Sequence, residues 1–197
     1  MSVAELQTQI QVLQIAGVLW GAIFIIWAIS AIGSKRTVRD QGDWRSRLSL
    51  WVVAAAWWLL FSQGVIRGPL AKHLISPSEG SDYAGLGLTI LGLGFALWAR
   101  IYIGRDWSGG VTLQEGHKVK RGGPYAIVRH PIYTGFMLAT LGTAIIYGTA
   151  GGLLSALMVM GAWGYKSRLE ESLLIAQFGA EYEQYRREVK GLIPFVW

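Results

Sequence analysis

The chain has 197 residues, of which 52% are hydrophobic and 15% charged, and its formal net charge is +6. This balance lies far from that of an ordinary soluble domain. The charges fall in blocks separated by uncharged runs of about membrane-spanning length, which is typical of a polytopic α-helical membrane protein. Membrane topology and anionic lipid headgroups explain the cations better than a nucleic-acid partner does.

Cysteine is absent, which excludes disulfides, thiolate catalysis and cysteine metal sites. The three histidines, His73, His117 and His130, lie far apart in the sequence and share no ligand spacing. Because a fixed metal needs several convergent ligands, we expect no metal. We also expect no nucleic acid among the partners, because membrane topology explains the cations.

Three apolar segments in the first half of the chain predict transmembrane helices. The first lies between Glu5 and Lys35 and is densest over residues 15–32. A signal peptide is the alternative, but no Lys or Arg precedes this run and it is longer than a signal core. The second segment, residues 48–66, spans close to the ~30 Å apolar core of a bilayer at about 1.5 Å per residue. The third covers residues 83–99.

The second half of the chain contains a longer apolar run, with no Lys, Arg, Asp or Glu between Arg129 and Lys166. As one helix this run would extend about 54 Å, well beyond a bilayer. The glycine-rich centre, residues 148–152, favours a tight reversal. The sequence therefore predicts a hairpin of helices four and five, with helix five continuing past Lys166, and a final helix over residues 180–190.

These assignments place 16 of the 18 Lys and Arg residues on one side of the membrane. The asymmetry predicts an N-terminus outside and a C-terminus in the cytoplasm of a multi-pass protein in the cell membrane. The predicted fold is an all-α integral membrane protein with five transmembrane helices, a helix 4-5 hairpin and a cytoplasmic C-terminal helical extension. Residues 1–197 form a single membrane domain, with three helices in 1–99 and the functional part in 100–197.

Polar residues at the two ends of the predicted hairpin form a candidate site. Pro131 suits the first turn of helix four, and the backbone amides and cations at Arg129 and His130 would attract an anionic group. Arg168 and Glu171, three residues apart, share one helix face, whereas the adjacent carboxylate points elsewhere. Cations facing a carboxylate suit a zwitterion such as the amino-acid end of a cofactor. The alternative is that these are topology charges on a solvated helix face.

Three runs resemble the isoprenylcysteine carboxyl methyltransferase family and its bacterial relatives. They are residues 123–135 (GPYAIVRHPIYTG), 168–174 (RLEESLL) and 178–185 (FGAEYEQY). The resemblance covers roughly residues 100–195, and it implies an integral membrane methyltransferase that uses S-adenosyl-L-methionine.

The resemblance also implies which residues hold this cofactor. Residues along the adenosine would be His117, Lys118 and Val119. Residues lining the pocket would be Tyr125, His130 and Tyr133, and Glu171 would meet the cofactor's amino group. From the helix-start argument above, Arg129 and Pro131 are expected at the cofactor as well. Phospholipid N-methyltransferases resemble the same pattern, and that version assigns the cofactor to Gly92, Gly94, Glu170 and Glu171. From the residues alone, close helix packing is the better reading of the two glycines, since no third glycine completes a dinucleotide fingerprint.

Methyl transfer from a sulfonium needs mainly alignment of donor and acceptor and exclusion of water. A carboxylate acceptor would need an orienting cation, for which Arg168 is the candidate, and an amine acceptor would need a base. The expected partner is a lipid or a hydrophobic small molecule offering a carboxylate, amine or thiol. Two alternatives remain open at this point: a membrane reductase with a nicotinamide phosphate cofactor, and a non-catalytic membrane interaction protein.

Overall fold

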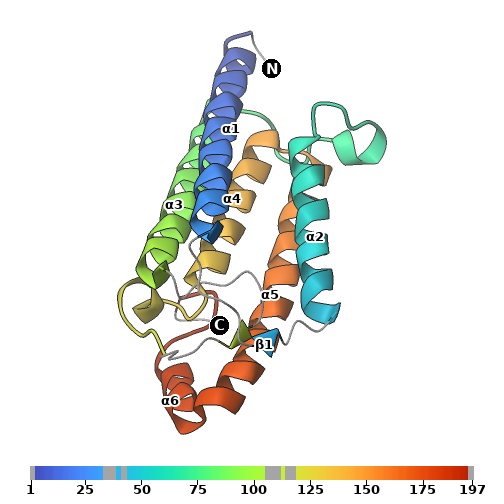
Figure 1. Cartoon of the computed structure of the whole chain (residues 1–197). Coiled ribbons are helices and arrows are strands. Elements are labelled where there is room, and N and C mark those ends of the chain that lie inside the picture. Colours follow the sequence, from blue (N-terminus) through green and yellow to red (C-terminus); the bar gives the residue numbers. More distant parts are fainter. Residues whose placement is uncertain (1–2, 33–38, 41–43, 105–111, 114–118, 195–197) are drawn as a thin grey trace.

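The computed structural model describes residues 3–32, 39–40, 44–104, 112–113 and 119–194. Five long helices make up most of this part of the chain (Figure 1). Their bounds are α1 Val3–Ile32, α2 Trp44–Phe61, α3 Glu79–Ile103, α4 Pro131–Tyr147 and α5 Ala150–Phe178. The short helix α6 Ala180–Glu188 follows α5, and two single 3-10 turns, η1 Gly68–Ala71 and η3 Gly123–Ala126, lie in the connections.

The helices pack as two groups that meet along α4 and α5. Helix α3 lies along α4, with α1 beside both, while α2 lies along α5 (Figure 1). The architecture is helical, as predicted, with one addition that the sequence pattern did not indicate. The strand β1 Arg39–Asp40 pairs antiparallel with β2 Thr112–Leu113 and so joins the segment after α1 to the segment after α3.

Two helices begin or end away from the predicted residues. Helix α2 ends at Phe61, five residues early, and residues 62–65 continue as turns, with the amide and the hydroxyl of Ser62 both donating to the Trp58 carbonyl at 3.0 and 2.7 Å. Helix α3 begins at Glu79, four residues before the predicted start. There Ser78 and Ser81 each accept a hydrogen bond from the backbone amide of the other, which is a capping box.

The reversal between α4 and α5 lies at the start of the predicted glycine cluster. Gly148 ends α4 with φ of +64°, a left-handed conformation that disfavours residues with a Cβ. The Thr149 hydroxyl then accepts from the amide of Gly152 and begins α5. The amides of Leu74 and Ile75 both donate to the Gly148 carbonyl, at 2.8 and 3.0 Å, so the segment before α3 holds this turn in place.

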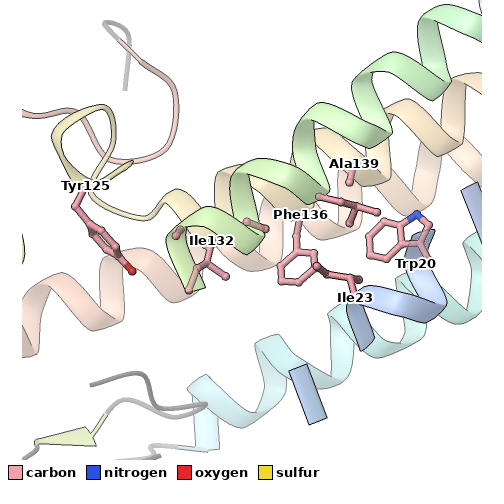
Figure 2. Packing of buried hydrophobic residues seen from close by; sticks show 9 residues of the cluster. Trp20, Ile23, Tyr125, Ile132, Phe136 and Ala139 are labelled. Atoms are coloured by element: carbon pink, nitrogen blue, oxygen red, sulfur yellow. The ribbon is translucent and has the colours of Figure 1, made fainter. Parts of the chain in front are cut away.

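Aromatic side chains fill the space between α1, α3 and α4. Figure 2 shows Trp20 and Ile23 of α1 packed against Phe136 and Ala139 of α4. Helices α3 and α4 are in backbone contact at Gly92, because this residue has no side chain. A Cβ added at Gly92 would lie 2.4 Å from the backbone nitrogen of Ala139. The packing interpretation of Gly92 is therefore confirmed.

The outer faces of several helices carry large apolar side chains. Ile25 on α1, Trp58 on α2 and Leu91 on α3 are 62%, 71% and 66% exposed. Two helices, over Glu5–Ser30 and Glu79–Ile103, are long and apolar enough to cross a bilayer, and the apolar helix α4 is shorter. A soluble domain rarely exposes so much apolar surface, so these faces suit contact with lipid. The count of five spans stays a prediction.

Candidate active site

The start of α4 is joined to the C-terminal segment of the chain. His130 precedes the helix and Pro131 is its first residue, as predicted. The backbone amide of Arg129 donates to the Lys190 carbonyl at 2.8 Å, and the amide of His130 donates to the Gly191 carbonyl at 3.0 Å. The C-terminal segment therefore occupies these two amides, and the attraction of an anionic group by the helix start and its cationic side chains stays a prediction.

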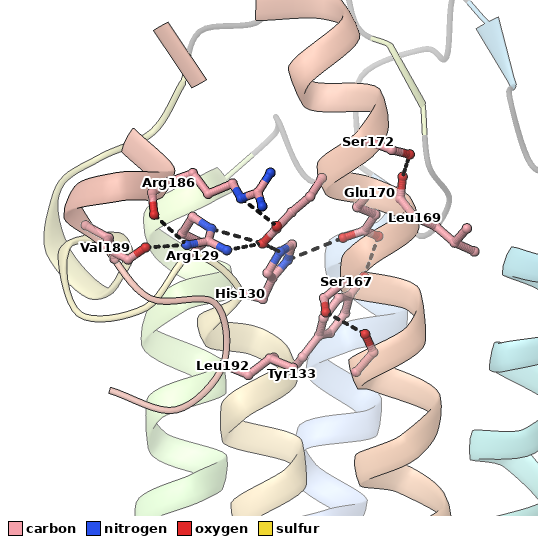
Figure 3. Close-up of polar contacts among 12 residues, drawn as sticks. Arg129, His130, Tyr133, Ser167, Leu169, Glu170, Ser172, Arg186, Val189 and Leu192 are labelled. Atoms are coloured by element: carbon pink, nitrogen blue, oxygen red, sulfur yellow. Dashed lines mark hydrogen bonds and ion pairs between the residues drawn. The ribbon is translucent and has the colours of Figure 1, made fainter. Parts of the chain in front are cut away.

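The His130 imidazole lies between the two adjacent carboxylates of α5. Its Nδ1 is 3.5 Å from Oε2 of Glu170, and its Nε2 is 3.2 Å from Oε1 of Glu171. Figure 3 shows the ring pointing from the start of α4 toward this part of α5. Burial alone lowers the pKa of His130, but the hydrogen bonds and charges of both carboxylates outweigh it, so the pKa is raised. The site therefore favours a protonated imidazole that bridges the pair.

Glu171 is held by a buried arginine. The Nε and Nη2 atoms of Arg129 both donate to Oε1 of Glu171, at 2.9 and 2.5 Å, and the two side chains are only 9% and 14% exposed. Arg129 also donates to the carbonyls of Arg186 and Val189, so one guanidinium joins α4, α5 and the C-terminal segment. Burial raises the pKa of Glu171, but hydrogen bonds from His130 and Arg129 outweigh this and lower it.

Glu170 takes part in the same cluster, contrary to the expectation that it points elsewhere. Its Oε1 accepts from the Tyr133 hydroxyl at 2.5 Å and lies 3.0 Å from Nζ of Lys166. Burial raises the pKa of this carboxyl, but the hydrogen bond from His130 and the charge of Lys166 lower it to about 2. Neighbouring residues on a helix differ by about 100° in direction, and His130 reaches both carboxylates because it lies between them.

Aromatic rings extend the cluster toward the apolar part of α5. His130 stacks on Tyr133 with ring centroids 5.5 Å apart, and Tyr133 stacks on Trp163 at 4.3 Å. Tyr125 lies in the turn η3 and is buried, and its carbonyl accepts from the Tyr185 hydroxyl. Burial raises the pKa of the Tyr125 phenol, which stays protonated at neutral pH.

A cavity of about 500 Å³ lies between α5 and the C-terminal segment. Arg168 and Glu171 both line it, which confirms that they share a helix face. The other lining residues are Arg129, Ser167, Ser172, Ile175, Arg186, Lys190, Gly191 and Leu192. The cavity therefore has several cations and one carboxylate around a partly apolar wall, as a zwitterionic ligand requires.

The remaining predicted site residues are placed as follows. Val119 is half-buried just before η3, whereas His117 and Lys118 lie outside the described residues. Gly92 is covered by α4, and the space beside Gly94 is open. Lys166 is a part of the site that sequence reasoning missed, because it was taken only as the first charge after the apolar run. Its spacing of four residues from Glu170 was the available signal.

A family profile described as phospholipid methyltransferase matches residues 81–181 of the chain, which run from the first turn of α3 to the first turn of α6. This chain belongs to the phospholipid methyltransferase family. The match includes the whole of α4 and α5 and therefore every carboxylate and histidine of the cluster described above.

The relatives that this chain matches have two kinds of name. The chain is 34% identical over 116 residues to a protein-S-isoprenylcysteine O-methyltransferase of Schizosaccharomyces pombe, covering 57% of this chain and 49% of that one. It is 47% identical over 70 residues to methanethiol S-methyltransferase 2 of Bradyrhizobium diazoefficiens, covering 36% of this chain and 26% of that one. The chain thus spans about half or less of the length of these two relatives.

The chain is also similar to a solved structure. That structure is the eukaryotic intramembrane Ras methyltransferase, isoprenylcysteine carboxyl methyltransferase, with a TM-score of 0.54 and 25% sequence identity. The superposition covers 81% of this chain and 55% of that one. The family predicted from residues 123–135, 168–174 and 178–185 is confirmed, and the helical fold is similar to that of this intramembrane methyltransferase.

Proposed function

We propose that this protein is a membrane methyltransferase that uses S-adenosyl-L-methionine to methylate a lipophilic or small hydrophobic acceptor. The observation that carries the proposal is the closed cluster of Arg129, His130, Tyr133, Glu170 and Glu171 within the segment matched to the family. The relatives named above are methyltransferases as well. None of these observations favours a nicotinamide-dependent reductase or a non-catalytic interaction protein.

The residues around the cavity fit the amino-acid end of this cofactor. Glu171 Oε2 is 3.8 Å from Nε of Arg186, beyond hydrogen-bond range, and so it keeps the capacity to accept from an ammonium group. Arg186 and Lys190 line the same cavity and suit a carboxylate. Tyr125, His130 and Tyr133 would form the aromatic side of the site, with Val119, and with His117 and Lys118 along the adenosine.

The cofactor supplies an electrophilic methyl group on a sulfonium, so the protein has to align two reactants and exclude water. Alignment alone is worth an effective molarity of roughly 10⁵ M or more. The Arg129–Glu171 pair and the His130 bridge hold the start of α4 against α5, which fixes the walls of the site relative to each other. Arg168 is the cation that we assign to orienting a carboxylate or thiolate acceptor.

The acceptor enters from the bilayer in this proposal. The start of α4 lies beside the cluster, and the residues that follow it, including Phe136, are apolar and packed among the helices. With five spans, an N-terminus outside and a cytoplasmic C-terminus in the cell membrane, the cluster would lie at the cytoplasmic boundary. A molecule with an apolar tail can then present its polar end to the site without leaving the membrane.

Calorimetry of S-adenosylhomocysteine binding to the purified full chain tests the cofactor assignment. Glu171→Gln removes the partner of an ammonium group, and a charge-assisted contact of that kind contributes about 1.5 to 3 kcal/mol, or roughly ten- to a hundredfold in affinity. His130→Ala should also weaken binding. Arg168→Ala should abolish methyl transfer with a much smaller effect on affinity, and Arg187→Ala, an exposed arginine of α6 outside the cavity, is its matched control.

The methyl-transfer assay uses a panel of acceptors drawn from the two kinds of relative: a prenylated cysteine with a free carboxylate, a small thiol, and an amine-headed phospholipid. Stabilisation of the protein by a nicotinamide phosphate cofactor, without any by S-adenosylhomocysteine, would refute the proposal. If Glu171→Gln binds like the parent and Arg168→Ala still turns over, the roles assigned to this face of α5 are wrong.

A further inference from the structure

Lys166, the buried lysine beside the cluster, makes more specific contacts than a lysine that only sets the membrane topology would need. Lys166 is 2% exposed, and its Nζ lies 3.0 Å from Oε1 of Glu170 and 3.3 Å from the hydroxyl of Ser46 on α2. An ammonium is strongly hydrated in water, and burying it costs several kcal/mol unless it is paired and hydrogen-bonded. A lysine that serves only membrane topology would extend to the surface instead.

The contacts of Lys166 fix how Glu170 is turned. Lys166 and the Tyr133 hydroxyl share one carboxylate oxygen, at 3.0 and 2.5 Å, and the other oxygen faces Nδ1 of His130 at 3.5 Å. Two donors on Oε1 leave Oε2 directed at the imidazole. With Lys166 removed, the Tyr133 hydroxyl alone would hold Oε1, and the carboxylate could rotate about its terminal torsion, which has a broad energy profile.

The same lysine ties a further helix to the site. Ser46 belongs to α2, which packs along α5 but contributes none of the cluster residues described above. Through Ser46, Lys166 and Glu170, the position of α2 is coupled to His130 and to the Tyr133–Trp163 ring stack. The two carboxylates are thus held from different sides, Glu171 by Arg129 and Glu170 by Lys166.

We propose that Lys166 is a positioning residue of the methyltransferase site, which holds the Glu170 carboxylate turned toward His130 and Tyr133. Its catalytic consequence rests on the proposed function, whereas its effect on Glu170 does not. The titratable groups facing Glu170 are Lys166 on α5, His130 before α4, Tyr133 on α4 and Tyr125 in η3. Of these, Lys166 is the one on the same helix as Glu170, four residues before it.

The first measurement is independent of methyl transfer. Burial raises the pKa of Glu170, but the hydrogen bond from His130 and the charge of Lys166 together lower it to about 2, and an opposite charge within about 4 to 6 Å lowers a carboxyl pKa by about 1 to 3 units. A lowered pKa contributes stability that is present above the unfolded value of 4.5 and is lost as the pH falls through the folded value. In Lys166→Met, the acid limb of melting temperature against pH should therefore move upward by about 1 to 3 pH units.

The second measurement is catalytic and uses the same variants. Lys166→Met should lower turnover on the order of 10²-fold, because small misplacements of site residues have effects of that size. The acid limb of the activity profile should move with the stability limb. Lys166→Arg keeps a buried positive charge and should recover most of both, and Lys72→Met, an exposed lysine at the other end of the molecule, should match the parent.

The outcomes separate this inference from the proposed function. If the parent binds no S-adenosylhomocysteine but Lys166→Met still moves the stability limb, the proposed function fails and the assignment of Lys166 to Glu170 stands. A Lys166→Met protein that melts at a lower temperature with an unmoved acid limb, and that Lys166→Arg does not rescue, would show a merely structural tie between α2 and α5. Full turnover in Lys166→Met would also overturn the inference.

Discussion

Replacing Arg129, which precedes α4, with methionine should destabilise the protein more than the removal of any single charge on α6. The side chain reaches Glu171 with two donors and the carbonyls of Arg186 and Val189 with a third. Both members of the ion pair are far from fully exposed, at 9% for Arg129 and 14% for Glu171, so salt screens the interaction little. Methionine keeps the apolar part of the side chain and removes only the guanidinium.

The size of the effect follows from the buried charge left behind. Removing one partner of a buried pair costs about 3 to 5 kcal/mol. Glu171 keeps the hydrogen bond with His130 at 3.2 Å, so the lower end, about 3 kcal/mol, applies here. For a chain of this length, 1 kcal/mol corresponds to about 2 to 4 °C in melting temperature. Arg129→Met should therefore melt about 6 to 12 °C below the parent.

Thermal unfolding in detergent measures this shift, at low and at high salt, with Arg187→Met as the control because Arg187 is exposed on α6. A double-mutant cycle with Glu171→Gln isolates the pair, since Arg129→Met should cost less once the carboxylate is neutral. A shift for Arg129→Met within 2 °C of the control would refute the argument from a buried charge. So would independent, additive effects of the two substitutions.

Three other predictions concern packing, titration and topology. Gly92→Leu should prevent α3 from approaching α4 and lower the melting temperature sharply, whereas Gly94→Leu, facing open space, should be tolerated; similar melting temperatures would contradict the packing analysis. Because the pKa of His130 is raised, its contribution to stability is present below the unfolded pKa of 6.5 and is lost as the pH rises through the folded pKa. The melting temperature of the parent should therefore fall as the pH rises on the alkaline side. The His130→Gln variant should lack this slope. Reporter fusions at Ser76 and at Gly191 should report opposite sides of the membrane, and equal readings would reject the five-span topology.

Local signals in the sequence were sufficient to predict where the helices lie. They also predicted the two halves of the site, the start of α4 and the charged part of α5. The apolar runs predicted where helices lie, and Pro131 and the glycines from Gly148 predicted where α4 begins and where the chain reverses. Such features depend on a residue and its near neighbours, through hydropathy, backbone conformation and capping. The capping box of Ser78 and Ser81 was a local signal too, and reading it would have corrected the start of α3.

The connections between the two halves depended on tertiary structure. Glu170 was expected to point away from the site, yet it meets Tyr133. The C-terminal segment, which the sequence did not place here, meets the amides of Arg129 and His130 with the carbonyls of Lys190 and Gly191. Lys166 looked like the end of an apolar run until Ser46 on α2 and Glu170 were seen around it. Apart from the Lys166–Glu170 pair, which lies within α5 at a spacing of four, these partners are separated by 37 to 120 positions in the sequence. For partners so far apart in the sequence, the packing of whole helices determines which buried polar and charged groups come into contact. A buried charge must be paired, so this packing also decides its partner.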